Sequence, residues 1–467
     1  MPSFRRFFSF SSFTLRSNRF QTSTRGIVTA AMATAVLNVS TPAPVEGETS
    51  MVVMKDGRPA HHLNDHKNSF HNPWKSFRKV PMTEMLPTIP KMLFSGPSIP
   101  KDIETQLKQQ VPTWGLTTPS NLSSPSKDPK KIKSTWLGHA CFLLELPAPD
   151  GAERGARILF DPVFSHRCSP FSFAGPARYT DPPCKMSDLP PVDIIVISHN
   201  HYDHLDTHTL TTLEKSHAPH IFAPLGNDAY FKSIGIPEDR THIMDWWEAR
   251  DVKVALPSSS SGGPTVEATF TVSCTPCQHF TGRGILDRFK TLWASWVIED
   301  RPASTSPSAP GVKCYFAGDT GYRTVHSEKE DDDPVALEKL PVCPEFKRIG
   351  EKFGGFDLAY IPIGFVTLSS LSEAVNGNAD SLSNSTFLNR AYKPREFMSP
   401  IHCAPKDSVR VFQDIKAKRA IGMHWGTWVL TLEPVMDPPK MLAEECKKLG
   451  IPDSAFNVCG LGETVFV

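Results

Sequence analysis

Short apolar runs separated by turn residues are the main hydrophobic pattern of the chain from residue 131 onward. One of them, residues 192–198, is rich in Val and Ile and is bounded by a proline and a polar cluster, which is typical of a buried strand. Helical periodicity predicts helices between some of the strands, at residues 210–217 and 407–418. Further strands are predicted at residues 135–146 (with a glycine break), 157–161, 265–274, 292–298, 312–317 and 357–363.

Strands dominate this order, and the chain shows no internal repeat of about 20–50 residues. Two sheets covered by helices fit the pattern better than a single parallel sheet. At 467 residues, 39% of them hydrophobic, the chain is long enough for one large α/β domain with extensions or for two ordinary domains. We predict a globular domain over residues 131–467, with polar surface insertions at 258–263, 301–311 and 366–390.

The first 130 residues differ in composition from the rest of the chain. Residues 1–45 contain Arg, Ser and Thr but no Asp or Glu, as mitochondrial presequences do. A disordered basic tail is the alternative. Residues 46–130 are Pro-rich and polar, and we expect them to form an arm that crosses the core. We therefore exclude residues 1–45 from the fold and predict a mitochondrial protein, in the matrix or associated with the inner membrane.

The net charge and the lengths of the apolar stretches limit which nucleic-acid and membrane partners the protein can have. The formal net charge is +1 and no basic stripe is present, which argues against a nucleic-acid partner. The apolar stretch at residues 27–39 is too short to span a bilayer, because a span takes about 20 apolar residues. If the protein meets a membrane, we expect it to do so from the surface.

The ten cysteines include one Cys-x-x-Cys pair, Cys274 and Cys277, without the second pair that a zinc ribbon needs. A redox motif is one interpretation, and two reduced thiols near a strand end is the other. We expect free thiols in a reducing compartment.

The strongest chemical signal follows directly after the predicted strand 192–198. His199, His201, Asp203 and His204 place four metal-binding side chains within six residues. Imidazole and carboxylate ligands suit zinc and related divalent ions. On an extended turn His199 and His201 can point to one ion, while Asp203 and His204 can point to a second where the chain enters a helix. A lone His-x-His pair would be weak evidence, but the complete pattern predicts a metal site.

Four ligands are too few for two ions, so further ligands must come from later in the chain. His279, Asp319 and His424 each stand at the end of an apolar run beside turn residues. Each is ambiguous alone, but together with the six-residue motif they support one another.

This ligand order, His-x-His-x-Asp-His followed by His, Asp and His, resembles that of the metallo-β-lactamase superfamily. The resemblance implies the metallo-β-lactamase fold, an α+β (αβ/βα) sandwich of two mixed β-sheets packed face to face, with helices on the outer faces and a dinuclear site on one rim. It also implies two Zn²⁺ per chain, with His199, His201 and His279 on one ion, Asp203, His204 and His424 on the other, and Asp319 as the bridge.

Two divalent ions about 3.5–4 Å apart can share a hydroxide and clamp the attacking and leaving oxygens of a reaction. They lower the pKa of water to about 7, and they stabilise negative charge at the reacting centre. This chemistry serves phosphodiesters, lactones and thioesters alike. The ligands therefore indicate a hydrolase without naming its substrate.

A closer resemblance narrows the substrate. Over roughly residues 70–467 the chain is similar to the N-acyl-phosphatidylethanolamine-hydrolysing phospholipase D branch of the superfamily, also outside the metal ligands. This resemblance implies zinc-dependent hydrolysis of that lipid to N-acylethanolamine and phosphatidic acid, a phospholipid substrate bound at a membrane surface, and often a homodimer. The matching segments are residues 72–74, 136–140, 161–165, 198–206, 245–248, 316–322, 356–364, 392–398 and 424–427.

The resemblance also implies which residues are catalytic. His402 matches a family histidine near the substrate and joins the carboxylates of Asp203 and Asp319 in the predicted catalytic set; a surface histidine in a loop before a helix is the alternative. The preceding position, often Gln in the animal enzymes, is Ile401 here, and the resemblance implies that the 366–390 insertion is beside the cleft. Both departures leave the acyl-chain and headgroup preference open.

Two other functions fit parts of the sequence. A lactonase or phosphoesterase of a small soluble substrate would use the same ligands, but the related sugar-lactonase branch lacks the 392–398 segment and the N-terminal arm. An inactive binding protein on this fold usually loses one or more ligands, whereas all seven positions are filled here. A nuclease is disfavoured because no long basic patch is present.

Overall fold

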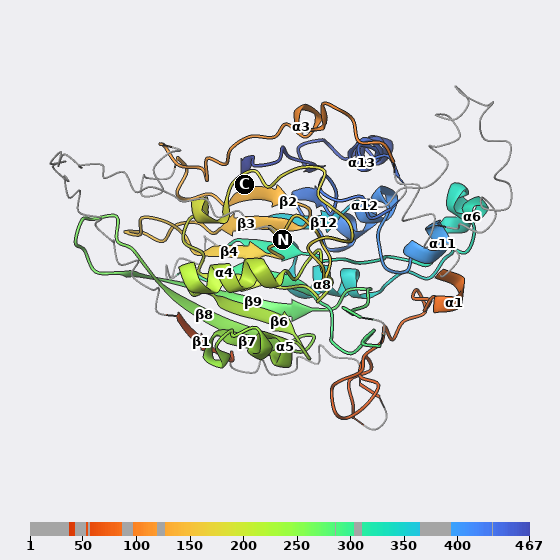
Figure 1. Cartoon of the computed structure of the whole chain (residues 1–467), viewed down its shortest axis with the longest axis horizontal. Helices are drawn as coiled ribbons and strands as arrows, with labels where there is room; N and C mark the ends of the chain where they lie inside the picture. The colour runs from red at the N-terminus through yellow and green to blue at the C-terminus, as the bar shows by residue number, and fades with distance from the viewer. Residues whose placement is uncertain are drawn as a thin grey trace, which may run out of the picture. The chain divides into compact units, whose positions relative to one another are not determined.

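Two β-sheets form the centre of the fold in the computed structural model of the chain (Figure 1). The predictions for the 366–390 insertion and for most of residues 1–45 concern segments outside the described residues. The structure describes residues 37–42, 53–54, 57–85, 97–118, 127–284, 286–302, 311–364, 394–431 and 433–467, all within the unit Ala35–Val467.

The first sheet has eight strands. Neighbouring strands are antiparallel from β1 to β11 and parallel from β11 to β14. In spatial order they are β1 (Leu37–Ser40), β8 (Ala249–Leu256), β9 (Val266–Thr275), β10 (Ser295–Asp300), β11 (Lys313–Phe316), β12 (Leu358–Pro362), β13 (Ala420–Met423) and β14 (Phe456–Asn457).

The second sheet has seven strands and the same division. Neighbours are antiparallel from β15 to β4 and parallel from β4 to β7, so both sheets are mixed, as predicted. In spatial order they are β15 (Thr464–Phe466), β2 (Lys133–Gly138), β3 (Cys141–Glu145), β4 (Arg157–Phe160), β5 (Ile194–Val196), β6 (His220–Pro224) and β7 (Thr241–Met244).

The sheets pack face to face through alternate residues of their strands. In β3, Phe142 belongs to the core between the sheets, whereas Leu143 belongs to a cluster on the outer face of the second sheet. The rings of Phe142 and Tyr360, from opposite sheets, lie 4.6 Å apart, and those of Phe160 and Phe316 stack at 4.5 Å. Burying an aromatic side chain in this way stabilises the fold by about 1.5–3 kcal/mol.

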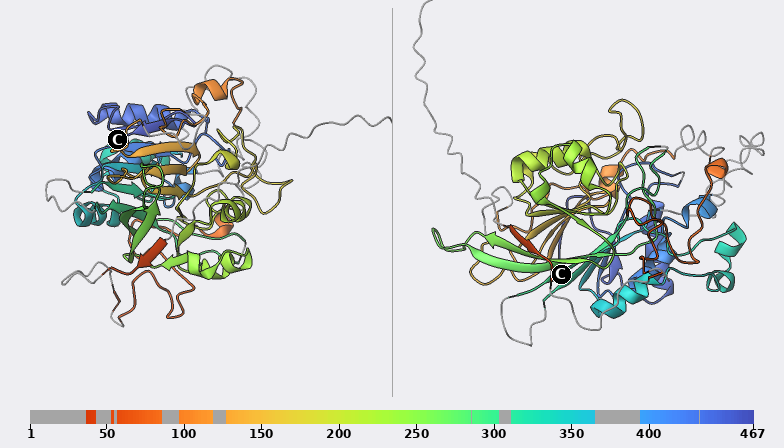
Figure 2. Two further views of the ribbon diagram at one scale, coloured as in Figure 1. Left: turned by 90° about the vertical axis from the view of Figure 1, so that its left-hand side faces the viewer. Right: turned by 90° about the horizontal axis from the view of Figure 1, so that it is seen from below.

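Helices cover the outer faces of the two sheets (Figure 2). Leu210 and Leu213 of α4 (Thr207–His217) and Phe231 of α5 (Asp228–Ser233) pack on the outer face of the second sheet. On the parallel half of the first sheet, α12 (Pro405–Asp414) contacts β12 and α13 (Asp437–Lys448) contacts β14, and α8 (Glu345–Phe353) packs against α12. The other described helices are short: α1 (Met82–Met85), α3 (Ile103–Gln106), η2 (Met186–Asp188), η3 (Glu238–Arg240), α6 (Glu328–Asp332), α7 (Pro334–Leu337) and α11 (Pro394–Met398).

The predicted strands and helices are present. Their ends differ from the expected ends by four residues or fewer. The run 135–146 is a hairpin of β2 and β3 rather than one strand, because the chain turns at Gly138 and His139. Several strands toward the sheet edges were not predicted, β8 among them. One face of β8 stays partly solvated, so Asp251 and Lys253 alternate with the buried Val252 and Val254 along the strand.

Strand β1 lies inside the segment 1–45 that sequence analysis excluded from the fold. It pairs along β8, with Leu37 opposite Val254 and Ser40 opposite Asp251. The folded part of the chain therefore begins before residue 45.

The described parts of the N-terminal arm pack onto the domain. Nε2 of His61 and Nε2 of His62 lie 2.7 Å and 2.9 Å from the two carboxylate oxygens of Asp245. Further along, the Asn72 amide donates to the carbonyl of His279 at 2.8 Å. The arm thus supports the backbone of a predicted metal ligand.

Two expectations from composition concern the membrane and the thiols. Among the described residues, no helix has both the length and the apolar character needed to cross a membrane. All ten cysteines are described and free. Burial raises the pKa of Cys274 and of Cys277 well above the usual value, which disfavours thiol exchange at this pair.

Candidate metal centre

The predicted metal ligands follow strand ends of both sheets. His199 to His204 follow β5 of the second sheet, while His279, Asp319 and His424 follow β9, β11 and β13 of the first. A β-carbon at Gly318 would lie 2.7 Å from Cβ of Ser198, so glycine lets the loop that carries Asp319 approach the loop that carries His199. The structure brings all seven predicted ligands together.

Three imidazoles and one carboxylate form a first group. Nδ1 of His201 lies 2.8 Å from Nε2 of His199 and 3.3 Å from Nε2 of His279. Oδ2 of Asp319 lies 3.8 Å from Nε2 of His199 and 3.7 Å from Nε2 of His279. Ligands about 2.0–2.1 Å from a tetrahedral zinc ion lie roughly 3.3–3.4 Å from one another. The spacing of these four atoms therefore suits one ion.

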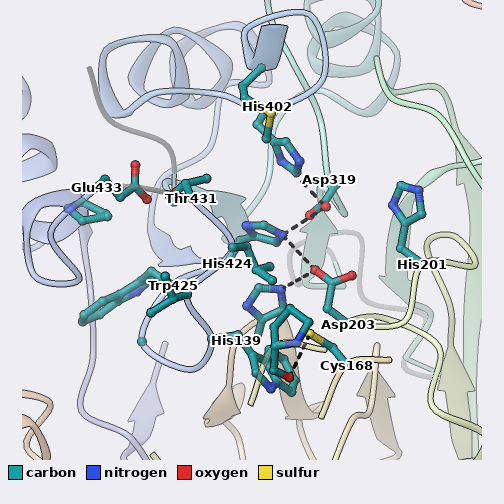
Figure 3. Close-up of a pocket in the computed structure, with 18 of the residues that line it drawn as sticks. His139, Cys168, His201, Asp203, Asp319, His402, His424, Trp425, Thr431 and Glu433 are labelled. Atoms are coloured by element: carbon teal, nitrogen blue, oxygen red, sulfur yellow. Dashed lines mark hydrogen bonds and ion pairs between the residues drawn. The ribbon is translucent and has the colours of Figure 1, made fainter. Parts of the chain in front are cut away.

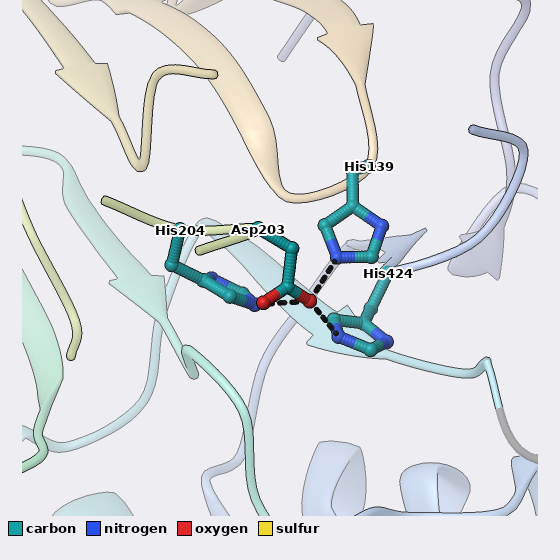
Figure 4. A group of neighbouring side chains, drawn as sticks. All are labelled: His139, Asp203, His204 and His424. Carbon is teal, nitrogen blue, oxygen red and sulfur yellow. Dashed lines mark hydrogen bonds and ion pairs between the residues drawn. The ribbon is translucent and has the colours of Figure 1, made fainter. Parts of the chain in front are cut away.

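Asp203, His204 and His424 form a second group (Figure 4). Oδ2 of Asp203 lies 3.5 Å from Nε2 of each histidine. Oδ2 of Asp319 lies 3.2 Å from His204 and 3.1 Å from His424. The same Asp319 oxygen is thus close to histidines of both groups, as a bridging carboxylate would be.

Asp161 orients one histidine of each group. Its Oδ2 lies 2.7 Å from Nδ1 of His204 and accepts the hydroxyl proton of Ser198 at 2.5 Å. The Ser198 oxygen can then accept the Nδ1–H of His199 at 2.9 Å. His279 places its Nδ1 2.8 Å from a backbone carbonyl. These contacts favour the tautomer that carries the proton on Nδ1 and presents the Nε2 lone pair to the cluster.

The protonation of the histidines reflects burial and the nearby carboxylates. Burial lowers the pKa of His199 and of His279 well below the usual value, so both stay neutral, as metal ligation requires. Burial acts in the same direction on His204 and His424, but the carboxylates of Asp319 and Asp203 outweigh it. They raise the pKa of His204 well above its usual value and that of His424 to about 9.

This cluster fits a divalent cation. Nε2 of His204, Nε2 of His424 and Oδ1 of Asp319 are buried and have no hydrogen-bond partner among the described residues. Unpaired buried polar atoms are costly, and a cation between them would satisfy all three. Imidazole and carboxylate are the ligands that zinc, iron and manganese bind in proteins.

A cavity of about 340 Å³ borders the cluster (Figure 3). Asp203, Asp319, His201 and His424 line its polar end. The cavity can hold a molecule that is polar at the metal end and apolar elsewhere. Its other walls are mainly apolar and aromatic, and include Tyr179, Phe280, Met398, Ile401, Trp425, Trp428, Val429, Leu430 and Val435.

His402 lies in the wall of this cavity rather than on the surface. Its Nδ1 is 3.8 Å from Oδ2 of Asp319, and its ring lies next to that of His424, with the ring centroids 5.0 Å apart (Figure 3). Burial lowers the pKa of His402 to about 4, so its imidazole is neutral at pH 7.

Two site residues, His139 and Asp161, were not predicted. Nε2 of His139 lies 3.0 Å from Oδ2 of Asp203. Both residues follow a strand end in a left-handed conformation, with φ values of 52° and 38°. Each is the only His or Asp of its matching segment, 136–140 or 161–165, so neither segment has ligand-like spacing. The sequence signal that could have identified His139 and Asp161 was the resemblance of both segments to the family.

Comparisons with known proteins show which family the chain resembles. The family model of the beta-lactamase superfamily domain matches residues 156–425, which include all seven predicted ligands. An N-acyl-phosphatidylethanolamine-hydrolyzing phospholipase D 1 from Caenorhabditis elegans is 33% identical over 339 residues, covering 71% of this chain and 74% of that protein. A mitochondrial protein of the same name from Saccharomyces cerevisiae is 28% identical over 411 residues, covering 80% of this chain and 71% of that one.

A solved structure of a novel metallo hydrolase from the archaeon Ignicoccus hospitalis is also similar. It is 15% identical, with 72% of this chain and 98% of that chain covered and a TM-score of 0.41. A match at such low sequence identity identifies neither the metal nor the substrate. The family model and the worm relative establish that the chain is a metal-dependent hydrolase of the metallo-β-lactamase superfamily and belongs to its N-acyl-phosphatidylethanolamine-hydrolysing phospholipase D family.

Proposed function

We propose that this protein is a zinc-dependent phosphodiesterase of the phospholipase D type, which hydrolyses N-acyl-phosphatidylethanolamine to N-acylethanolamine and phosphatidic acid. The observation that carries the proposal is the junction of the ligand cluster with an apolar, aromatic cavity. An anionic phosphodiester suits the cluster, and hydrocarbon chains suit the walls. The names of the worm and yeast relatives support this substrate.

Two zinc ions per chain are part of the proposal. Bound divalent ions would generate a nucleophile from water at neutral pH and stabilise charge on the phosphoryl group. The ring-nitrogen and carboxylate spacings within both groups support this assignment. The proposed ligands are His199, His201 and His279 for one ion and Asp203, His204 and His424 for the other, with Asp319 shared.

The proposed catalytic side chains are Asp203, Asp319 and His402. Asp203 and Asp319 act by holding the two ions at one face of the cavity. His402 is neutral at pH 7, because burial lowers its pKa to about 4, and it lines the same cavity. We therefore place it against the substrate phosphate, where one ring nitrogen can donate a hydrogen bond.

The proposed reaction makes one bond at phosphorus, breaks one bond at phosphorus and transfers one proton. The oxygen of water joins phosphorus, the bond from phosphorus to the ethanolamine oxygen breaks, and a proton ends on that oxygen. Zinc-loaded protein incubated with N-acyl-phosphatidylethanolamine vesicles in ¹⁸O-water should give labelled phosphatidic acid and unlabelled N-acylethanolamine by mass spectrometry. Label in the N-acylethanolamine, release of diacylglycerol, or turnover of a small lactone but not of the lipid would contradict the proposal. The Asp319→Asn variant is the background control.

We also propose which side of the molecule meets the lipid surface. The loop that lines the cavity at Cys168 and Pro176 carries Phe171 and Phe173 between them, 54% and 79% exposed. Tyr202 joins the cavity to a groove bordered by Phe171. Exposed aromatic residues at the mouth of a lipid-binding cavity suit contact with a bilayer. Changing both phenylalanines to serine should weaken vesicle binding with zinc content unchanged, and unchanged binding would exclude this loop.

Location, domain limits and assembly complete the proposal. The Arg-rich, acid-free start of the chain and the yeast relative's printed name support a mitochondrial location, in the matrix or at the inner membrane. Because β1 pairs with β8, a removable presequence would end before Leu37. Residues 46–130 then form the arm and residues 131–467 the catalytic domain.

Imaging of a carboxyl-terminal fusion tests the mitochondrial location of the protein. Light scattering tests the homodimer that the family implies.

A further inference from the structure

His139 occupies the tight turn between β2 and β3, and one of its ring nitrogens lies within 4.8 Å of the ligand atoms of Asp203, His204 and His424. Gly138 and His139 have φ values of 105° and 52°. A left-handed conformation costs a residue with a β-carbon about 1–2 kcal/mol. Such strain persists where the surroundings hold the residue in place, and it is common at functional sites.

The surroundings of His139 include predicted ligands that are remote from it in sequence. Its Nε2 lies 3.0 Å from Oδ2 of Asp203, and its carbonyl accepts the backbone N–H of His424 at 3.2 Å. The two imidazole rings lie 4.1 Å apart. His424 itself has a φ of 64°. One turn residue therefore contacts both Asp203 and His424.

The hydrogen-bond geometry of His139 differs from that of His204 and His424. The Nε2–H of His139 is directed at the Asp203 oxygen, as a donor requires (Figure 4). Nε2 of His204 and Nε2 of His424 lie at similar distances from carboxylate oxygens, but neither is in hydrogen-bond geometry. Each of those two nitrogens lies 3.1–3.5 Å from Oδ2 of both Asp203 and Asp319, so an ion near these two oxygens would be within reach of both nitrogens.

We propose that His139 is a positioning residue for the second metal ion: its ring holds the Asp203 carboxylate and its backbone holds His424. This inference rests on the proposed two-ion site. A histidine ligated to zinc would instead direct a lone pair at the ion. A donor to a ligating carboxylate fixes the orientation of that carboxylate without contacting the ion.

The test is a chelator-competition titration of zinc into the full-length protein, which measures the affinity of each ion. In His139→Phe we expect one ion to bind about 10–100-fold more weakly, the loss typical of removing such a contact, and the other to bind as in the wild type. His139→Gln, whose amide nitrogen takes the place of Nε2, should recover most of the affinity. Phospholipase activity should follow the occupancy of the weakened ion.

Two further variants keep the test decisive. His61→Phe removes a buried histidine from a different carboxylate, Asp245, and should lower the melting temperature without changing zinc affinity. If His139→Phe does not fold, His139→Asn replaces it, because asparagine tolerates φ > 0 but its amide cannot reach Asp203.

Each outcome bears on a distinct claim. Wild-type affinity for both ions in His139→Phe would overturn the inference. A His139→Gln variant as weak as His139→Phe would also overturn it, because the ring would then be a ligand. A wild type that binds fewer than two ions would contradict the proposed two-zinc site, on which the inference rests.

Discussion

The most informative single substitution is Asp161→Asn, because this buried carboxylate supports one histidine in each ligand group. Asp161 is 1% exposed and does not line the cavity. Its Oδ1 accepts the backbone N–H of Ser198 at 2.7 Å, and its Oδ2 contacts both the Ser198 hydroxyl and Nδ1 of His204. An asparagine keeps the volume but offers one carbonyl oxygen in place of two carboxylate oxygens.

The expected magnitude follows from these contacts. With the Asn oxygen toward the Ser198 backbone, the amide NH₂ faces two donors, so His204 and Ser198 both lose their acceptor. Losing a partner of this kind typically lowers metal affinity by about 10–100-fold, or roughly 1.4–2.7 kcal/mol. Because Ser198 in turn orients His199, we expect both ions to bind more weakly. In His139→Phe, by contrast, we expect only one of the two ions to bind more weakly.

The assay is the same zinc titration, with thermal unfolding of the metal-loaded and metal-free forms. Asp245→Asn is the matched control, because it alters a buried carboxylate that lies 2.7 Å from His61 and 2.9 Å from His62 and, in the described part of the chain, contacts no predicted ligand. A variant with unchanged affinity for both ions, or with a loss at one ion only, would refute the orienting role of Asp161. An equal loss of affinity in the Asp245→Asn control would show that the effect is not local.

Three further predictions concern the ligand cluster itself. Asp319→Asn removes the shared carboxylate and should abolish turnover with the far-ultraviolet circular dichroism unchanged; wild-type activity would contradict a bridging role. His402→Ala should lower the rate several-fold with zinc content unchanged, and an unaltered rate would leave His402 without a catalytic role. Zinc binding at about pH 7 should release protons, because the carboxylates raise the pKa of His424 to about 9 and that of His204 well above its usual value, and affinity should fall as the pH drops. Calorimetry in buffers of different ionisation enthalpy measures this release, and buffer-independent heats would contradict it.

The metal ligands could be predicted because their signal is local. His199, His201, Asp203 and His204 lie within six residues, and the later ligands stand where apolar runs end. Since the carboxyl ends of several strands meet near one place in a layered α/β fold, residues at those ends are natural partners. The sequence pattern therefore contained most of the ligand cluster.

His139 and Asp161 could not be predicted in the same way because they act on other residues. Their roles depend on φ values of 52° and 38° and on contacts with Asp203, Ser198 and His204 that no spacing rule encodes. The same holds for the apolar cavity walls, which come from separate loops.

The fold was predictable where burial produces uninterrupted apolar runs, as in β5 and β12. It was not predictable where a strand has one solvated face, as in β8. Strand β1 was missed because it adjoins an Arg-rich segment and is only four residues long. Its pairing with β8 is a tertiary event that local sequence does not indicate.

The most direct test of the central claim is a crystal structure of the zinc-loaded protein with anomalous data collected on both sides of the zinc absorption edge. We predict two anomalous peaks about 3.5–4 Å apart, one beside His199, His201 and His279 and the other beside Asp203, His204 and His424, with Asp319 between them. A single peak, or peaks away from these seven side chains, would contradict the account.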